Sequence, residues 1–386
     1  MVQRAKSVNP AVLTWARERA GLSILEVAER LGKSTDAIAS WEEGRAYPAY
    51  GQLETLAESI YRRPVALFFL PEPPDEIPAQ REFRRLPQTD ASALSADTLY
   101  ALRDAHAFQA SLRELTGGKN LASRQIFRDL RPQRESDLPA LAEIAREYVG
   151  VSLSAQLTWS NEEKAVAEWR GALEDVGVFV FKRSFQDRTV SGFCLDDPDF
   201  PLIIVNNSTS FTRQVFTLFH ELAHLLVGVS TISSNDYSQL ARFTSTDRAL
   251  EVACNRFAAD FLVPDSGFPW QDFQAAKSER FLAAMAERYS VSREVILRKA
   301  RDRGLVTPDE YLYFTNTWAN EPARDGGGET GGNYYATQSV YFSKRFLELT
   351  FAQFRAGRIT LSEVAEHLRM RAKNVEKFEG YLMRRG

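Results

Sequence analysis

The sequence predicts a multidomain, mainly α-helical protein that contains one small α+β domain. At 386 residues the chain is too long for a single ordinary core and suggests two or three domains. Apolar residues recur at helical spacing over much of the chain, and three strand-like runs lie within residues 178–206. We therefore expect a helical module at 1–70, a Pro-rich linker at 71–90, a helical spacer at 91–159, an α+β domain at 160–285 and a helical C-terminal region at 286–386.

The composition is that of an ordinary globular protein, with 44% hydrophobic and 26% charged residues. A formal net charge of −3 excludes a basic surface over the whole chain, so any nucleic-acid binding must be local. Cys194 and Cys254 are too few for a disulfide framework, which is typical of a reducing compartment. No run reaches about 18 uninterrupted apolar residues, and the N-terminus leads into a helix, so we expect a cytoplasmic protein without a membrane span.

Glycines and capping residues divide residues 1–70 into helices expected at 10–20, 24–31, 36–43 and 50–60. The second and third helices are joined by Gly32-Lys33-Ser34, the short glycine-containing turn of a helix-turn-helix. The module carries nine Lys/Arg and eight Asp/Glu, a net charge of +1. Phosphate contacts supply much of the affinity for DNA, so a single copy of this module would bind DNA weakly. Two copies in a homodimer would bind it more tightly.

The segment ARERAGLSILEVAERLGKSTDAIASWEEGRAYP resembles the XRE (Cro/cI-like) family of DNA-binding domains, including its Trp41-Glu42-x-Gly44 ending. The resemblance implies operator DNA as the partner, with residues 33–41 in a major groove. It implies base or phosphate contacts at Lys33, Ser34, Thr35, Asp36, Ala37, Ser40, Arg45 and Arg17, of which the two arginines would meet phosphates. Ile24 and Leu25 stand where the family commonly has Gln, so the module could instead have kept the fold and contact protein.

The next region is expected to connect rather than to catalyse. Residues 71–78 form an extended linker, because proline excludes helix and central strand. We interpret the basic cluster at 81–86 as a solvated linker end. Helices are expected at 94–115 and 139–148, and His106 has no evident partner, so we interpret it as structural.

One apolar stretch, residues 215–227, contains His-Glu-x-x-His. On a helix, His220 and His224 lie on one face, close enough to share a metal ion. Glu221 is about 100° further round the helix, where it can reach a water molecule without being a ligand. Two imidazoles and a carboxylate base are the groups that hydrolytic zinc requires. The alternative is a buried helix that carries two histidines by chance or as a decayed motif.

A metal site with two histidine ligands needs a third protein ligand, and the sequence limits the residues that could supply it. The metzincin pattern would place a histidine where the chain has Ser230, so that class is excluded. The helix expected at 247–263 offers the acids Asp247, Glu251 and Asp260, and Glu251 lies at mid-helix. We interpret Cys254 as a small buried residue. A helix at 161–176, strands at 178–181, 190–195 and 201–206, and then the histidine helix follow the order of a compact α+β zincin.

HELAHLL followed by EVACNRFAADFLVP resembles the ImmA/IrrE family of zinc metallopeptidases. The resemblance implies Zn²⁺ held by His220, His224 and Glu251, with Glu221 as general base and Asn255 in support. It also implies a specific protein substrate, expected to be a transcriptional repressor that is cut in a stress or mobile-element response. The rival hypothesis is a non-proteolytic repressor or antitoxin-like protein, which would use the zincin fold as a sensor or to bind a partner such as a cognate toxin. A third possibility is a protease whose N-terminal helical module binds protein and not DNA.

Substrate contacts are harder to predict. In such domains the strand before the metal helix often holds a peptide by strand addition, which makes Leu202, Ile204 and Asn206 candidates; plain sheet core is the alternative. Tyr237 and Asn206 are guesses for the group that stabilises the oxyanion. Residues 156–280 carry 17 Asp/Glu and 11 Lys/Arg, a net charge of −6, so direct chemistry on DNA is not expected.

The C-terminal region is expected to be helical and regulatory or dimer-forming. Ser292 should cap a helix, a Gly-rich loop spans 322–333, and helices are expected at 340–356, 361–369 and 373–383. Residues 360–368 echo residues 23–31 of the first helix-turn-helix. The echo is either a second degenerate module or only a similar capped helix, and from the sequence we favour the similar helix.

Overall fold

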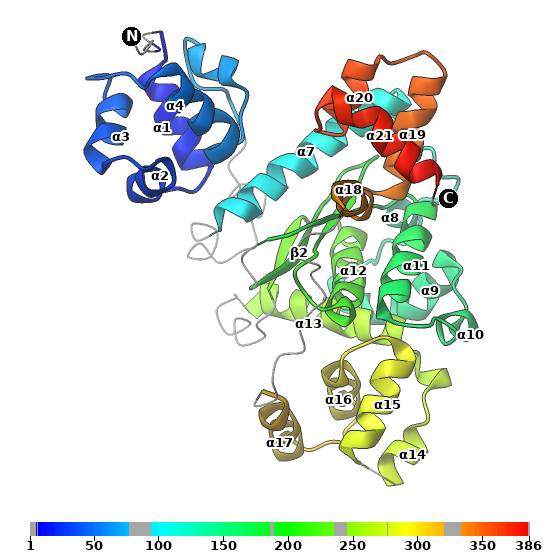
Figure 1. Cartoon of the computed structure of the whole chain (residues 1–386). Coiled ribbons are helices and arrows are strands. Elements are labelled where there is room, and N and C mark those ends of the chain that lie inside the picture. The colour runs from blue at the N-terminus through cyan, green and yellow to red at the C-terminus, as the bar shows by residue number, and fades with distance from the viewer. Residues whose placement is uncertain are drawn as a thin grey trace. The chain divides into compact units, whose positions relative to one another are not determined.

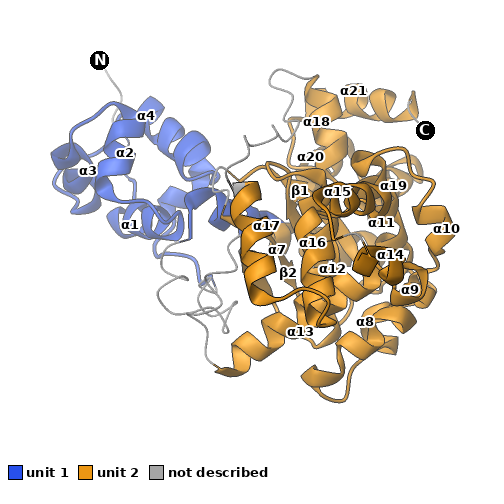
Figure 2. Cartoon of the chain, turned by 90° about the horizontal axis from the view of Figure 1, so that it is seen from below, with its two compact units in different colours: residues 1–104 blue, residues 105–386 orange. Residues whose placement is uncertain are grey.

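The computed structural model describes residues 5, 7–76, 94–185, 189–234, 245–275, 277–319 and 333–384. The chain divides into two compact units, residues 1–104 and 105–386, and the boundary falls within α7 (Ala96–Thr116) (Figure 2). The basic cluster at 81–86, Tyr237 and most of the Gly-rich loop lie outside the described residues. Within the described ranges, no helix combines the length and the apolar character needed to cross a membrane.

The first unit is a bundle of short helices whose ends follow their capping residues. Its elements are α1 (Pro10–Arg19), α2 (Ile24–Leu31), α3 (Thr35–Glu42), α4 (Tyr50–Glu54), the π-helical turn η1 (Thr55–Ile60) and the 3-10 turn η2 (Val65–Phe69). Ser23 and Glu26 form a capping box at the start of α2, and Gly32 ends that helix with φ of 65°. Ile38 and Trp41 project from α3 into the core. The helix-turn-helix predicted from the sequence is confirmed.

The second unit consists of helices around one small sheet. Its described helices are α8 (Ile126–Asp129), α9 (Ala142–Val149), α10 (Leu153–Gln156), α11 (Glu162–Asp175), α12 (Phe211–Leu226), α13 (Ser245–Leu262), α14 (Trp270–Ala275), α15 (Glu279–Tyr289), α16 (Arg293–Asp302), α17 (Pro308–Ala319), α18 (Tyr334–Tyr341), α19 (Lys344–Arg355), α20 (Leu361–His367) and α21 (Ala372–Met383). The strands are β1 (Phe179–Arg183), β2 (Val190–Leu195), β3 (Leu202–Asn206) and β4 (Thr231–Ser234). The predicted fold class, mainly α with a small α+β core and an all-α N-terminal module, is confirmed.

The sheet is mixed, with strand order β1-β3-β2-β4. β1 pairs with β3 in parallel, and β2 pairs antiparallel with both β3 and β4. The sequence analysis missed β4, because its four residues, Thr-Ile-Ser-Ser, are too few to show alternation. β4 matters because it borders the helix that carries the two histidines.

Helices cover both faces of the sheet (Figure 1). α11 and α12 pack on one face, against β1 and against β2 and β3 respectively. The other face packs against α7, α18 and α19: the ring centroids of Phe108 and Phe181 lie 4.2 Å apart, and those of Phe181 and Phe346 lie 5.5 Å apart. Residues 333–384 therefore form part of the core of this unit.

The helix predicted at 340–356 is present as α19 at 344–355, but its predicted start is four residues too early, because the chain breaks between α18 and α19 at Phe342 and Ser343. Arg170, buried on α11, donates hydrogen bonds to the carbonyls of Val340 and Phe342 at 2.9 and 2.8 Å. Carbonyls that bond to a guanidinium cannot continue a helical ladder at full strength. Arg170 thus helps to hold the break, and Ser343 marks it locally by capping α19, where its hydroxyl accepts from the Phe346 amide at 3.1 Å.

Replacing Gly192 by Ala should destabilise this sheet, because the added Cβ would lie 2.6 Å from the Ile204 carbonyl oxygen and 2.7 Å from the Thr217 methyl group. We expect the free energy of unfolding to fall by about 1–3 kcal/mol in urea denaturation. Gly171→Ala is the matched control, since nothing lies within 4 Å of the Cβ that it adds to α11. That control should stabilise by about 0.5–1 kcal/mol, and equal urea midpoints for the two variants would contradict the packing.

Candidate metal centre

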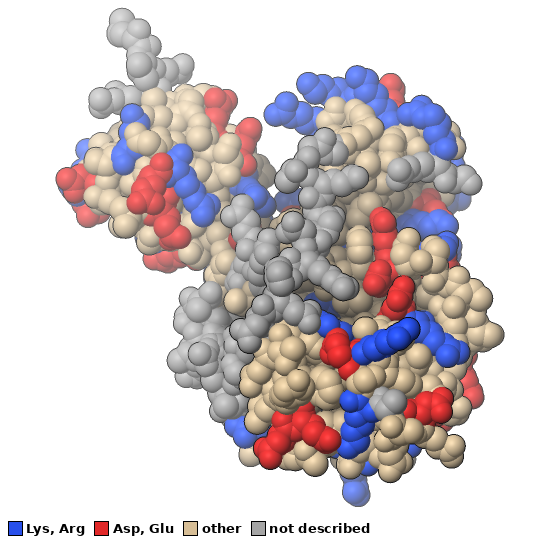
Figure 3. All heavy atoms as spheres, turned by 60° about the horizontal axis from the view of Figure 1, so that its bottom comes forward, with Lys and Arg blue, Asp and Glu red and all other residues tan. Residues whose placement is uncertain are grey.

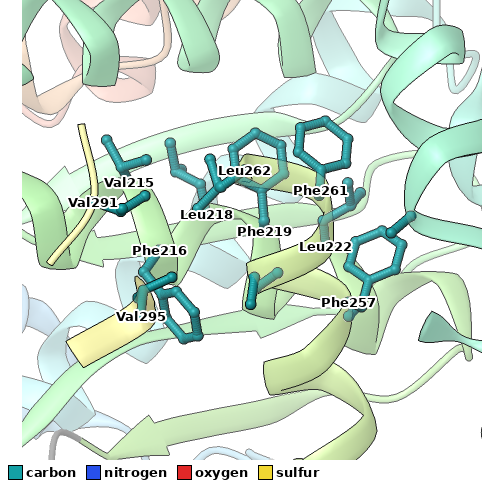
Figure 4. Packing of buried hydrophobic residues seen from close by; sticks show 14 of the residues in the cluster. Val215, Phe216, Leu218, Phe219, Leu222, Phe257, Phe261, Leu262, Val291 and Val295 are labelled. Atoms are coloured by element: carbon teal, nitrogen blue, oxygen red, sulfur yellow. The ribbon is translucent and has the colours of Figure 1, made fainter. Parts of the chain in front are cut away.

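The helix α12 is buried on nearly every side, from Gln214 to Leu226. Its apolar residues interlock with α13 (Figure 4), where the ring centroids of Phe219 and Phe261 lie 4.0 Å apart. Trp169 of α11 packs edge-on against both of these rings, at 4.9 Å from Phe219 and 5.4 Å from Phe261. These contacts fix the rotation of α12 about its axis. As a result, His220 and His224 face the Glu251 side chain of α13.

Three donor groups converge at this point. The Nε2 atoms of His220 and His224 lie 3.2 Å apart. Each is 3.3 Å from one carboxylate oxygen of Glu251. The two histidines are buried and the Glu251 side chain is 14% exposed. Within the described residues, this is the one group of three or more His, Cys, Asp or Glu side chains with the spacing of a metal site.

The spacing fits a tetrahedral ion. With metal–ligand bonds of about 2.0–2.1 Å, adjacent ligands of a regular tetrahedron lie about 3.3–3.4 Å apart. The observed separations of 3.2 and 3.3 Å match that edge length. Two imidazoles and one carboxylate also leave a fourth position for water or substrate. The residues therefore fit a divalent metal ion such as zinc.

Asn255 orients one of these ligands. It lies one turn after Glu251 on α13, and its Oδ1 is 3.1 Å from His220 Nδ1. An acceptor at this position makes Nδ1 carry the proton, which leaves the Nε2 lone pair directed at the other donors. Because Asn255 is only 9% exposed, water competes little for this contact.

The electrostatics of the group are strongly coupled. Burial alone would raise the pKa of Glu251, but the charges and hydrogen bonds of the two imidazoles hold it well below its usual range. Burial would lower the pKa of His220, yet its hydrogen bond and charge interaction with Glu251 more than offset this and raise it. The carboxylate therefore stays ionised, as a metal ligand must.

Glu221 has a different environment. It is fully buried, and burial raises its pKa. Neither carboxylate oxygen makes a hydrogen bond of normal geometry within the described part of the chain, although the Ser233 hydroxyl and the Cys194 thiol lie close enough to oppose the rise. A buried carboxyl without hydrogen bonds is costly in a purely structural helix. Such a group is better explained by a role toward a bound water or substrate.

A cavity of about 360 Å³ adjoins the centre. Its walls come from the loop and first turns of α12, from α13 and from α16. Its lining includes Phe216 and Asn255, each one helical turn from a donor residue, but none of the three donors themselves. Its charged lining residues are Arg213, Arg298 and Glu294, of which the last two form an ion pair at 2.8 Å. The size is in the range of natural ligand pockets. The sequence analysis missed these lining residues, because three separate segments contribute them.

The predicted substrate strand is corrected by the sheet order. β3 already pairs on both sides, with β1 and β2, so it has no edge to which a peptide could add. Leu202 and Ile204 are fully buried in the core. Asn206 Nδ2 donates to the Val190 carbonyl at 2.8 Å, and its Oδ1 accepts from the backbone amides of Ser208 and Phe185 at 2.9 and 3.2 Å. These residues hold the sheet together rather than a substrate.

The structure spreads the predicted DNA contacts over α3 and its surroundings. Lys33, Thr35 and Asp36 are exposed, Ala37 and Ser40 are half-buried, and the Ser34 hydroxyl caps α3. Exposed Arg45 pairs with Glu43.

Arg17 has protein partners in this structure, and the phosphate contact predicted for it stays a prediction. Its Nε and Nη2 atoms bind the Glu42 carboxylate at 2.8 and 2.9 Å, and Nη1 donates to the Leu22 carbonyl at 3.1 Å. With a side chain only 14% exposed, Arg17 braces α1 against α3.

Comparison with known protein families finds a match for the region of the donor group and a match for the N-terminal helical module. Residues 173–301 match the IrrE N-terminal-like domain of the M78 peptidase family. Residues 11–67 match a helix-turn-helix domain. The chain thus combines a helix-turn-helix domain with an IrrE N-terminal-like domain. No curated protein matches it. The IrrE-like match includes α12 and α13, which carry the donor group, and nearly all of α16, which lines the cavity.

Asn255→Ala should lower the affinity of the IrrE-like domain for a divalent metal about 10- to 100-fold, because His220 loses the acceptor that fixes its tautomer. Titration of Zn²⁺ against a chromogenic chelator measures this. Asn255→Asp keeps an acceptor at the same position and should bind metal nearly as the wild type does. If the two variants bind Zn²⁺ equally well, the orienting role is refuted.

Proposed function

We propose that the protein is a DNA-binding regulator and a zinc-dependent endopeptidase that acts in the cytoplasm on a specific protein, with a repressor-type substrate cut in a stress or mobile-element response. The observation that carries the proposal is the convergence of His220, His224 and Glu251 at tetrahedral spacing beside a buried carboxyl, Glu221. The matched M78 peptidase domain supports the same class of reaction.

Each residue then has a defined task. His220, His224 and Glu251 would hold Zn²⁺, which when bound supplies the Lewis acidity for hydrolysis of a peptide bond. Glu221 would accept the proton of the attacking water and deliver it to the leaving nitrogen. Its burial favours this role, because a carboxyl with a raised pKa holds a proton more readily at neutral pH than an exposed one does.

The substrate would occupy the cavity beside the centre. Asn255 lines the cavity and contacts the ligand His220 at 3.1 Å, so a substrate segment bound there would lie within reach of the donor group. A cleft shaped by three helices admits an extended segment of a protein more readily than a compact domain. We infer that the substrate presents a loop or linker to the enzyme.

The helix-turn-helix domain supports a regulatory rather than a digestive role. A domain of this kind implies DNA as a partner. Together with a peptidase domain it would concentrate cleavage near an operator, where a repressor is found. A homodimer would bring two such domains to one site.

Glu221→Gln should abolish proteolysis while metal binding persists, because the amide cannot accept a proton and the three donors are unchanged. We expect cleavage to fall at least about 100-fold. The measurement compares new protein N-termini, by mass spectrometry, in cells that express the wild type or the variant.

Glu287→Gln, an exposed carboxyl on α15, is the matched control and should leave cleavage unaltered. If no N-terminus depends on Glu221, the peptidase proposal fails. In that case intact DNA-dependent regulation by Glu221→Gln would favour the non-proteolytic repressor.

A further inference from the structure

The C-terminal helices α19, α20 and α21 repeat the geometry of the N-terminal helix-turn-helix. Residues 360–379 align without a gap on residues 23–42, at a constant offset of 337. Over that span Glu26, Val27, Ala28, Glu29, Leu31 and Glu42 recur as Glu363, Val364, Ala365, Glu366, Leu368 and Glu379. The similarity therefore extends past one capped helix into the turn and the helix after it.

The helices α2 and α20 begin with the same capping motif. The Thr360 and Ser23 hydroxyls accept from the amides of Glu363 and Glu26, at 3.3 and 3.2 Å. In return, each glutamate accepts from the backbone amide of its own capping residue, at 2.6 and 2.8 Å. Such a reciprocal pair is a capping box, so both helices begin in the same way.

The turns also match. Gly32 and Arg369, at equivalent positions, both adopt the left-handed conformation, with φ of 65° and 48°. The next amide bonds back to the equivalent alanine carbonyl in each module, Lys33 to Ala28 at 2.9 Å and Met370 to Ala365 at 3.0 Å. A non-glycine residue adopts this conformation only when its surroundings require it. The turn geometry is therefore kept although the glycine is not.

The helices before and after complete the module. α1 and α19 both end in Arg-Ala-Gly, at Gly21 and Gly357, whose φ values are 64° and 66°. The second module has one extra residue before its capping threonine. Val375 and Phe378 are buried at the positions of Ile38 and Trp41, so α21 turns the same face to its core as α3 does. The opposite face of α21 is the one that a recognition helix offers to DNA.

That face is basic in the second module only. Residues 369–384 contain five Lys/Arg and two Asp/Glu, a net of +3, whereas the equivalent residues 32–47 contain two and three, a net of −1. Arg371, Lys373 and Lys377 are exposed on α21, and within the described residues none of the three forms an ion pair. Elsewhere on the unit, acidic and basic side chains are interspersed on the face that Figure 3 displays.

We propose that residues 344–384 are a second helix-turn-helix and that α21 binds double-stranded DNA. Arg371, Lys373 and Lys377 correspond to Ser34, Asp36 and Ser40 of the first module, where a recognition helix meets the groove and its flanking phosphates. Their positive charge supplies the electrostatic attraction that the first module lacks. The proposal does not depend on the peptidase activity.

The test uses the full-length chain and a labelled DNA duplex of random sequence, with fluorescence anisotropy recorded over a range of salt concentrations. Arg371→Glu/Lys373→Glu/Lys377→Glu should lower affinity at least tenfold and make the plot of log K against log salt shallower by about 2 to 3, as expected for three lost phosphate contacts. Lys33→Glu/Arg45→Glu in the first module should weaken binding less.

Two controls separate charge from fold. Lys164→Glu/Arg256→Glu/Arg288→Glu reverses three exposed charges of the same unit that lie outside residues 344–384, and this variant should bind DNA as the wild type does. Arg371→Lys/Lys373→Arg/Lys377→Arg keeps the charge and should retain affinity. Wild-type affinity and salt dependence in the α21 charge-reversal variant would overturn the proposal. A preference for double-stranded RNA of the same sequence would also overturn it.

Discussion

The packing of α12 against α13 is the constraint on which the metal centre depends. Neither helix can form the centre alone, because two donors lie on one helix and the third on the other. The stacked rings of Phe219 and Phe261 fix both the spacing and the relative rotation of the helices. Trp169 of α11 packs against both rings, so neither helix can rotate without disrupting this cluster. Apolar packing thus provides the precision that the polar donors need.

The sheet serves the centre indirectly. β3 is central in the sheet and fully buried, and it supports α12, which packs against it. β4 places Ser233 next to Glu221. The second face of the sheet is covered by the C-terminal helices and by α7 (Figure 1). Because Phe181 stacks on Phe108 and packs against Phe346, the C-terminal region is integrated into the same core. A DNA-binding surface on α21 would therefore be attached to a rigid support.

Two helix-turn-helix modules of similar geometry would have different roles in DNA recognition. The first has caps, turn and core in place, yet its recognition surface is nearly neutral, with Arg17 bound to Glu42 and Arg45 to Glu43. The second has the same capping box and turn geometry, and its exposed Arg371, Lys373 and Lys377 make no ion pair within the described ranges. Affinity for the phosphate backbone and selectivity for bases are separable terms. One chain could therefore derive each from a different module.

The sequence by itself determined the local structure and the identity of the donors. The helix-turn-helix, the histidine helix, three of the four strands and the position of Glu251 at mid-helix all follow from spacing, caps and apolar periodicity, which act over a few residues. The tertiary structure decided what depends on long-range pairing. It made β3 central rather than an edge, turned Arg17 toward Glu42, and assembled the cavity from three segments.

The repeat at residues 360–379 also has one part that the local sequence determines and one part that only the tertiary structure shows. Its first nine residues are visible as an echo in the sequence, but Arg369 conceals the turn, because a non-glycine residue does not signal the left-handed conformation. Only the fold, which shows that backbone geometry, reveals that the echo continues through the turn into the helix that follows.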